Sequence, residues 1–459
     1  MEVLSQAPQP TIKCYHSVVN GKATCLNYQY FTPSSDYTSG KNLQSYNFER
    51  SLENFGGSFS FTVKEDVENS DDLFMDKVQP LDIIIISESG SDARRDFIGV
   101  VTTISIGGIA SNLNKIVTVS GKGIEWLFSY FNINCDIKSM ITENNSANKT
   151  MLADLSKKQG TEGLSIKDVA LESFKTFKKY VSGIKGAESS GYAVTTNYIL
   201  GDIINLMFGE DFIDAADVKL SYPISSNLFT SGKINIIDYL KKLFPSPIYE
   251  IFGTIGEDLR PKLCIREVPF DNPSAKYRIE PNKLTDFTLT RSCEEVYTAF
   301  LSYIEGSQLS PDQYMNIIAA QGTEKGYNFT QPNKEKIKMY GYQLLTCSFV
   351  GFNNDPNAVL NKDSLSKINE KLNKWFSNLD EMYTGDFTMV NMITEKPARI
   401  GEWLQFADGL FYVISEKHSW NYGDNPMINY QVTRGGTYPE GKFKPMKKLS
   451  MAYKEFVVK

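Results

Sequence analysis

The chain has 459 residues, 41% of them hydrophobic and 22% charged, which is enough for about two to four domains with ordinary packed cores. Its net charge is −6 at pH 7. This excludes duplex nucleic-acid binding driven by phosphate neutralisation, which needs a clustered positive surface, but it leaves open a neutral or acidic passage through which nucleic acid slides.

The first 123 residues are expected to form a β unit. In residues 58–63 the side chains of Phe59, Phe61 and Val63 alternate with Ser and Thr, which is the period of two of a half-buried strand. Three further strands are expected at 81–87, 97–106 and 115–121. Short polar loops join the four strands, so an antiparallel sheet or a small closed barrel is predicted. Strand-like pieces within 11–50 are assigned to the same unit.

The middle of the chain, residues 124–285, is expected to mix helices and strands. Residues 142–163 are polar and predict an exposed loop. Apolar residues at helical spacing predict a helix that begins after Asn235 as its N-cap and stops at Pro245. Other helices are predicted at 124–131, 166–181 and about 199–207, and a strand pair at 248–253 and 263–266.

The β pattern returns in residues 286–436. Strands are predicted at 287–290, 296–304, 387–393, 403–406, 410–415 and 428–433. A loop and helix insertion interrupts this second β unit at about 306–384. Its first part, 306–340, is rich in Gly, Pro, Asn and Lys and predicts an excursion from the sheet, and a helix is predicted over 365–379. A tail of residues 437–459 follows.

The fold class predicted by this order is α+β, with two antiparallel β domains on either side of a mixed α/β middle. The two β units also have similar endings. Residues 97–101 followed by 116–121 resemble residues 411–414 followed by 428–435, since in each a strand follows a polar turn and a later strand ends at glycine. Any two antiparallel hairpins share this much, so the pattern leaves duplication and coincidence equally open.

The order of four local motifs resembles the baseplate hub, or tail hub, proteins of bacteriophage tails and related contractile injection machines. The resemblance spans about residues 50–436, and each motif alone is degenerate. The motifs are residues 82–86 with 97–101 and 117–121; residues 236–240 leading to 249–253; residues 263–270; and a closing block of 401–404, 411–414, His418 and 432–435.

The resemblance implies two tail-tube-like β-barrels in each chain and a homotrimer whose six barrels match a sixfold tail tube. It implies contact with the tail tube protein on one side and with a central spike or tail-tip protein on the other. The tape measure protein and other baseplate proteins are further candidate partners, with DNA only as passing cargo. The expected location is the virion tail or baseplate, after assembly in the host cytoplasm. Residues 306–340 and 437–459 fit no pattern of this family, and a separate spike or wall-degrading subunit is expected.

The cysteines and histidines offer little material for catalysis. None of the six cysteines has CxxC spacing, so reduced, buried thiols are expected, although Cys14 and Cys25 could meet across a hairpin. The two histidines, His16 and His418, are too few for a histidine-based zinc site or a Ser-His-Asp triad. His418 is expected to be a packed or hydrogen-bonded histidine.

Other polar groups are read as structural. Glu68, Asp71, Asp72 and Asp76 lack calcium-loop spacing, and residues 353–357 are read as a turn. Glu250 with Glu257 and Asp258 is a weak candidate for a glycosidase pair. The lysines at 334, 336 and 338 are read as solvated surface, and Gly183, Gly186 and Gly191 do not have phosphate-loop spacing.

Accordingly, no catalytic, cofactor-binding or metal-binding residue is predicted, and the chain is expected not to be an enzyme. The start of the chain lacks the apolar core of a signal peptide, and no apolar run is long enough to cross a membrane, so neither Sec-type export nor stable membrane insertion is expected. The main hypothesis is a structural hub. The alternative is a cell-wall hydrolase or receptor-binding tail-tip protein that uses residues 140–285. Only the aromatic content and the scattered carboxylates support this alternative.

Overall fold

A computed structural model describes most of the two β units and part of the middle. The described residues are 10–17, 25–31, 42–66, 78–89, 94–107, 114–130, 132–133, 194–195, 223–224, 234–256, 259, 261–305, 323–324, 327–330, 334–350, 362–391 and 396–446. The predicted loop at 142–163 and the helices predicted near 166–181 and 199–207 lie outside these ranges.

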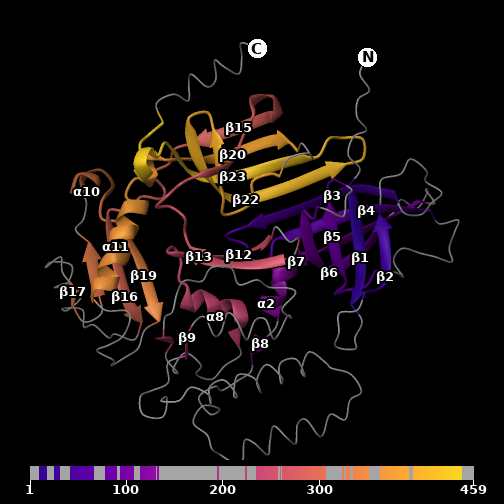
Figure 1. Ribbon diagram of the computed structural model, residues 1–459, viewed down its shortest axis with the longest axis horizontal. Helices are drawn as coiled ribbons and strands as arrows, with labels where there is room; N and C mark the ends of the chain where they lie inside the picture. Colours follow the sequence, from indigo (N-terminus) through magenta and orange to yellow (C-terminus); the bar gives the residue numbers. More distant parts are fainter. Residues whose placement is uncertain are drawn as a thin grey trace, which may run out of the picture.

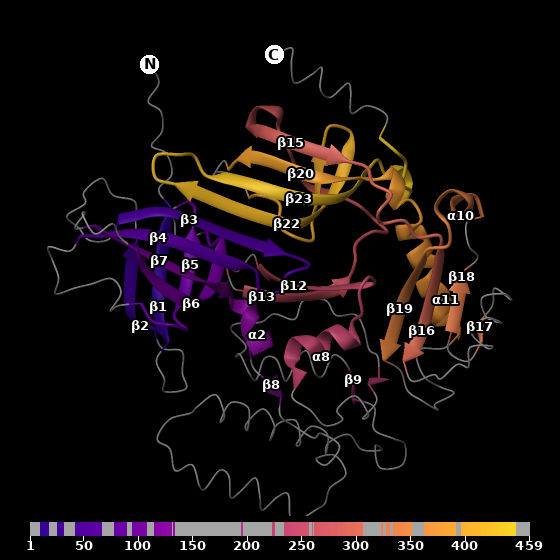
Figure 2. The same ribbon diagram turned by 180° about the vertical axis from the view of Figure 1, so that it is seen from behind.

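The fold is mostly β and is organised around one large, curled, antiparallel half-barrel sheet (Figures 1 and 2). Within the described residues this sheet has thirteen strands, in the order β15-β20-β23-β22-β3-β4-β7-β6-β5-β1-β2, with β21 and β14 attached at β22. One set of strands comes from each end of the chain, and the two sets meet where β22 pairs with β3.

The first β unit contains the four strands predicted for it, preceded by three more. The seven strands are β1 (Thr11–Ser17), β2 (Cys25–Phe31), β3 (Asn42–Ser51), β4 (Ser58–Asp66), β5 (Ile83–Ser87), β6 (Phe97–Gly107) and β7 (Asn114–Gly123). The alternation in β4 has the predicted result, because Phe59, Phe61 and Val63 are all buried. Cys14 is buried and lies opposite Gln29 in the β1–β2 ladder, so it does not face Cys25.

The second β unit contains β14 (Ala275–Arg278), β15 (Leu284–Thr290), β20 (Tyr383–Val390), β21 (Trp403–Phe406), β22 (Gly409–Asn421) and β23 (Met427–Gly436). β22 extends six residues beyond the strand predicted at 410–415. The prediction ended early because residues 416–419 are Glu, Lys, His and Ser. Their inward-facing members, Glu416 and His418, are nevertheless completely buried.

The two units repeat one strand topology. Taken in chain order, β3, β4, β5, β6 and β7 form the arrangement β3-β4-β7-β6-β5, and β15, β20, β21, β22 and β23 form the matching arrangement β15-β20-β23-β22-β21. Before the third strand of each unit, Leu81 and Gly401 have φ values of 74° and 76°. Leu81 N–H donates to Val101 O at 2.8 Å, and Gly401 N–H donates to Val413 O at 2.9 Å.

Two of the register shifts in the ladders also recur at matching places in the two units. The β3–β4 ladder shifts register between Leu43 and Ser45, and the β15–β20 ladder shifts between Leu284 and Asp286. The β6–β7 ladder shifts between Val101 and Thr103, and the β22–β23 ladder shifts between Val413 and Ser415. Matching these shifts makes residues 43–51 equivalent to 284–292, and residues 97–107 equivalent to 409–419. This repetition of register favours duplication over coincidence, which the sequence pattern left open. The sequence comparison placed 97–101 against 411–414, two residues from the structural match.

A third module lies beside the sheet and combines the middle of the chain with the insertion in the second β unit. Its helices and longer strands are α8 (Ile236–Leu243), β12 (Tyr249–Ile255), β13 (Pro261–Glu267), β16 (Ala299–Glu305), β18 (Tyr327–Thr330), β19 (Leu344–Val350), α10 (Lys334–Tyr340) and α11 (Lys362–Phe376). The short segments are β8 (Asn132–Ile133), β9 (Val194–Thr195), β10 (Pro223–Ile224), β11 (Ile234–Asn235), β17 (Thr323–Glu324), α2 (Leu127–Tyr130) and the 3₁₀ turn Ile124–Trp126.

Two sequence predictions in this module are confirmed. Asn235 is the N-cap of α8, and its side chain accepts a hydrogen bond from the Asp238 N–H at 2.7 Å. The strand pair β12–β13 forms as predicted. In the described part of the predicted excursion at 306–340, β17 and β18 join β16 and β19 in a four-stranded sheet.

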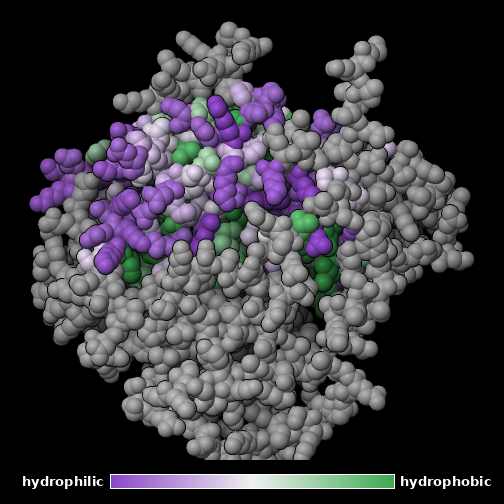
Figure 3. All heavy atoms as spheres, in the orientation of Figure 1, coloured by the Kyte–Doolittle hydropathy of each residue, from purple (hydrophilic) through white to green (hydrophobic). Residues whose placement is uncertain are grey.

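Each β unit and the third module has its own buried core. The first core includes Phe48, Phe61 and Phe97, and the second includes Phe387, Phe411 and Tyr430. The core of the third module joins Leu240 of α8 to Leu372 and Trp375 of α11. The face in Figure 3 is mostly hydrophilic over α10 and α11 and shows hydrophobic side chains near β6 and β7. No described helix is long and apolar enough to cross a membrane.

We expect Gly121→Ala to lower the free energy of unfolding by about 1–3 kcal/mol, the usual effect of overpacking. A Cβ at Gly121 would overlap the Val100 carbonyl oxygen and lie 2.6 Å from the Phe59 ring. Gly107→Ala is the control, because a Cβ there meets nothing within 4 Å. Chemical denaturation measures both, and equal stability of the two variants would contradict the close packing of Phe59 on β7.

Candidate functional site

The pairing of β22 with β3, here called the strand junction, holds the two β units in one sheet (Figure 2). The pairing is antiparallel and runs from Ser415 opposite Ser51 to Asn421 opposite Ser45. It places Glu416 directly opposite Arg50, and His418 directly opposite Phe48. The rings of His418 and Phe48 stack with centroids 4.3 Å apart. The ladder therefore brings an ionic pair and a stacked pair together from distant parts of the sequence.

A buried charged cluster surrounds the strand junction. Arg50 lies 3.2 Å from Glu416, and Arg399 lies 3.6 Å from the same carboxylate. Arg399 and Arg94 also reach Asp96, at 3.3 and 2.7 Å. The side chains of Asp96 and Glu416 are completely buried, and that of Arg50 is 4% exposed. Three arginines thus pair with two carboxylates in the interior, and Arg94 also lies 3.6 Å from a third, Glu88.

Glu88 links this cluster to the stacked histidine. His418 Nδ1 lies 3.1 Å from Glu88 Oε1, and His418 Nε2 lies 3.9 Å from Glu416 Oε2. Tyr46 O–H donates to Glu88 Oε1 at 3.0 Å, and Asn391 Nδ2 donates to Glu88 Oε2. The Glu88 N–H in turn donates to Asp96 Oδ2 at 2.8 Å. The loop that carries Glu88 and Asp96, between β5 and β6, is therefore fastened to both β units.

Burial and charge oppose each other in setting these pKa values. Burial alone would raise the pKa of Glu416, but Arg399, His418 and Arg50 outweigh it and lower that pKa to about 2. Burial alone would lower the pKa of His418, but Glu88 and Glu416 outweigh it and raise that pKa above the ordinary value. Glu416 is consequently ionised, and His418 is held toward its charged form.

The cluster is suited to holding strands together and not to chemistry on a substrate. Glu88, Glu416 and His418 have no exposed surface, so no reactant reaches them. The predicted packed, hydrogen-bonded state of His418 is confirmed. In the part of the chain that the structure describes, no group of three or more His, Cys, Asp and Glu side chains could hold a metal ion.

Glu250, the one described member of the weak glycosidase candidate, is also a structural carboxylate. It is 8% exposed on β12. Its Oε1 accepts a hydrogen bond from Arg266 Nε at 2.6 Å, and its Oε2 accepts one from the Tyr412 hydroxyl. Burial raises the pKa of Glu250, against the opposing effects of Arg266 and Tyr412. Oε1 is therefore paired across the β12–β13 hairpin, and Oε2 attaches the hairpin to β22. Glu257 and Asp258 lie outside the described residues.

The remaining sequence candidates divide into two groups. The lysines of α10 are only partly solvated as predicted. Lys334 and Lys338 are exposed, but the side chain of Lys336 is 12% exposed and binds Asp380 and the Ser377 carbonyl. Of the others, His16 has only its backbone described, in β1, and the rest lie outside the described residues: Glu68, Asp71, Asp72, Asp76, Gly183, Gly186, Gly191 and residues 353–357.

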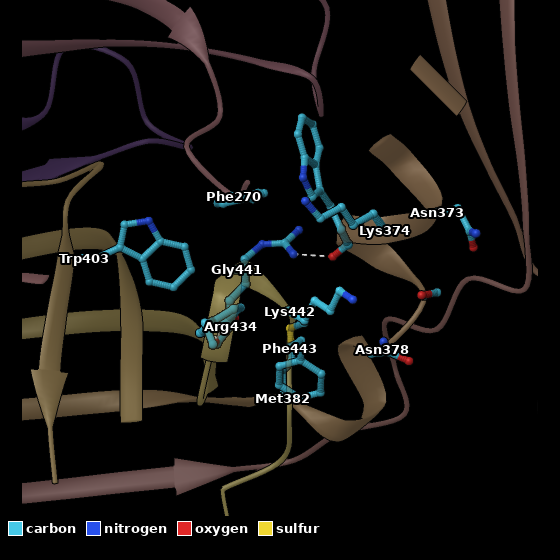
Figure 4. Close-up of a pocket in the computed structure, with 13 residues that line it drawn as sticks. Phe270, Asn373, Lys374, Asn378, Met382, Trp403, Arg434, Gly441, Lys442 and Phe443 are labelled. Carbon is cyan, nitrogen blue, oxygen red and sulfur yellow. Dashed lines mark hydrogen bonds between the residues drawn. The ribbon is translucent and has the colours of Figure 1, made fainter. Parts of the chain in front are cut away.

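A pocket of about 250 Å³ opens between α11, β21 and β23 (Figure 4). Its buried cation, Arg434, lies with its guanidinium carbon 3.8 Å from the centre of the Phe270 ring and 4.4 Å from that of Phe376. Its Nη1 donates to the Trp375 carbonyl in the last turn of α11, one of the carbonyls that a helix leaves unpaired. Burial lowers the pKa of Arg434 to about 10. Arg434 thus fastens the end of α11 to the second β unit.

Sequence reasoning missed most of the charged cluster, although a signal for it exists. In both strands of the junction, charged residues continue an inward-facing series with a period of two: Tyr46, Phe48 and Arg50 in β3, and Glu416, His418 and Trp420 in β22. A charge in such a series indicates a buried partner, but its identity depends on pairing between strands far apart in sequence.

Comparison with solved structures identifies the fold as that of phage tail proteins. The 43 kDa tail protein of prophage MuSo2 from Shewanella oneidensis matches with a TM-score of 0.51 and 11% identity, over 95% of this chain and 100% of that one. A tail protein from Neisseria meningitidis matches with a TM-score of 0.49 and 9% identity, over 92% of this chain and 96% of that one. A chain of the Francisella PdpA–VgrG complex matches with a TM-score of 0.44 and 11% identity, over 97% of this chain and 56% of that one.

The resemblance to phage tail hub proteins predicted from the sequence is therefore confirmed at the level of the fold. No family model matches the sequence, and no curated protein matches it.

We expect Glu416→Gln to lower the free energy of unfolding by about 3–5 kcal/mol, because it leaves Arg50 and Arg399 buried beside an uncharged group. Lys417→Gln, at the next and exposed position of β22, should change it by no more than about 0.5 kcal/mol. Denaturant unfolding at neutral pH measures both. A Glu416→Gln protein as stable as wild type would show that the charges do not stabilise the junction.

The pH dependence of stability should follow from the same cluster. The contribution of Glu416 is fully present above its ordinary pKa of 4.5 and is lost as the pH falls toward about 2. The contribution of His418 is fully present below its ordinary pKa of 6.5 and is lost as the pH rises through its raised pKa. Unfolding measured across pH should show the acid loss reduced in Glu416→Gln and the alkaline loss reduced in His418→Gln. Unchanged pH profiles in both variants would contradict these assignments.

Proposed function

We propose that this protein is a structural tail hub. In this proposal three copies form a pseudo-sixfold ring that joins the tail tube to the central spike or tail tip of a phage or phage-like injection machine. Each of the two β units acts as one tail-tube-like barrel domain of the ring, the first within residues 1–123 and the second formed by β14 and β15 (275–290) with β20 to β23 (383–436). The helices and strands between 124 and 267, together with those between 299 and 376, form the module beside them.

The observation that carries the proposal is the repeated β unit and the way in which its two copies are joined. A chain that holds two equivalent units side by side in one sheet supplies two of the positions of a ring of such units. Three chains would supply six, which matches a tube of sixfold symmetry. The fold shared with a phage tail protein supports placing this ring in a tail.

A structural role without catalysis agrees with how the polar groups of the described residues are used. The carboxylates of Glu88, Glu250 and Glu416 are buried and hydrogen-bonded or ion-paired to neighbouring strands. Such groups hold strands in register, whereas a general acid or base must reach a substrate. A separate subunit would then supply any activity against the cell wall.

The proposed partners are the tail tube protein on one face of the ring and the spike or tail-tip protein on the other, with the tape measure and other baseplate proteins as further contacts. DNA is proposed to pass through the ring without staying bound. The net charge of −6 supports this, because it opposes lasting attachment of a polyanion. The virion tail or baseplate is the proposed location, after assembly in the host cytoplasm.

The proposal predicts a trimer, formed alone or on addition of the tail tube or spike protein. Native mass spectrometry and sedimentation should give three times the mass of one 51.7 kDa chain. Electron microscopy of the same sample should show a threefold ring with a central hole. A protein that stays monomeric with and without these partners would refute the ring.

A further inference from the structure

The two β units differ at their free edges in a way that the strand junction explains. In the second unit, the later half of β22 (415–421) pairs with β3, while its first half pairs with β21. In the first unit, the first half of β6 pairs with β5 in the same manner. Within the described residues, no strand pairs with the later half of β6, Thr102 to Gly107, on the side away from β7.

The matching free edge is at the other end of the sheet. β15 occupies in the second unit the place that β3 occupies in the first. Among the described strands β3 has neighbours on both sides, β4 and β22, whereas β15 pairs with β20 alone. Among the described strands, each chain therefore has two free edges. The later half of β6 is equivalent to the half of β22 that forms the junction, and β15 is equivalent to β3.

Burial at equivalent positions shows what these edges lack. His418 of β22 is completely buried, but its equivalent in β6, Ile106, is 48% exposed. Phe48 of β3 is completely buried, but its equivalent in β15, Leu289, is only half-buried. The residues on the free edges are as apolar as those in the junction or more so, so their exposure comes from a missing neighbour strand.

We infer that β6 of one copy of this chain pairs antiparallel with β15 of a second copy, in the register of the β22–β3 junction. In the junction, Lys417 pairs with Glu49. The residue equivalent to Lys417 is Ser105, and the residue equivalent to Glu49 is Thr290. Ser105 therefore lies opposite Thr290 of the next copy. By the same correspondence Ile106 lies opposite Leu289. This pairing rests on the proposed ring and specifies which strands close it.

The register can be tested by cross-linking the full-length chain with a short bismaleimide. In a Cys293→Ser background, the pair Ser105→Cys and Thr290→Cys should give covalently joined chains, since directly opposite Cβ atoms lie about 5 Å apart. The link cannot form within one chain, because six strands separate β6 from β15, a path of roughly 30 Å along the sheet. Mass spectrometry of the joined peptides identifies the two residues.

A matched pair, Ser105→Cys with Thr285→Cys, is the control for register. Thr285 is an exposed threonine on the same strand, roughly 17 Å from Thr290 along it. It should give little joined product.

Equal cross-linking of both pairs, or none in a sample that is trimeric by mass, would overturn the inferred register and leave the proposed ring unaffected. A chain that stays monomeric with and without tube protein would overturn the ring and the joint together. Cross-linking at the inferred pair in an assembly of another size would support the joint and refute the trimer.

A charge on the β6 edge gives a second test that does not depend on cross-linking. Ile106→Asp should raise the concentration needed for assembly at least about tenfold, because the joint would bury an unpaired carboxylate. The melting temperature of the dissociated chain should stay unchanged, since position 106 is half exposed there. Ile116→Asp is the control, because Ile116 is similarly exposed, at 45%, but lies on β7, which has strands on both sides. Assembly unaffected by Ile106→Asp would contradict the joint.

Discussion

The arrangement of the molecule depends on the antiparallel pairing of β22 with β3. The pairing converts two repeated β units into one sheet, and it does so with an ion pair on the inward face, Glu416 opposite Arg50. Buried ion pairs add little net stability, because removing both charges from water costs about as much as their attraction returns. Their stronger effect is on register. A shift of two residues would separate Glu416 from Arg50 and leave the buried guanidinium of Arg50 without its carboxylate, so the charges favour one alignment of the two units.

Much of the β structure is predictable from the sequence, because a strand buried on one side carries its pattern locally. The alternation around Phe59 and Phe61 and the cap at Asn235 both have the structural consequence that their chemistry implies. The end of β22 was not predictable in this way. Glu416 and His418 suit a buried strand only because Arg50 and Glu88, more than 300 residues away in sequence, complete them. The charged cluster, and the equivalence of residues 97–107 with 409–419, likewise require knowledge of pairing between distant strands.

The internal junction and the inferred joint between copies share a geometry but differ in chemistry. Glu416 and His418 of β22 correspond to Ile104 and Ile106 of β6, so the edge that stays within the chain is charged and the edge offered to a neighbour is apolar. An apolar edge suits a joint that forms after folding, because the free chain then exposes no charged side chain that needs a partner in the joint. The charged edge suits a joint that forms during folding, when the cluster around Asp96 assembles with it.

This difference also discriminates against wrong pairing. If β6 of one copy took the place of β22 on β3 of another, Ile104 would face Arg50 and the guanidinium would be buried without Glu416. Leaving one charge of a buried pair uncompensated is among the largest single penalties that a fold can incur. Errors between like strands of a repeated unit are the natural hazard of a chain that contains the unit twice. Because the charges lie at one junction and not at the other, β3 distinguishes its correct neighbour, β22, from the equivalent strand, β6. This discrimination is the physical condition for an ordered ring in which the units are not joined in the wrong order.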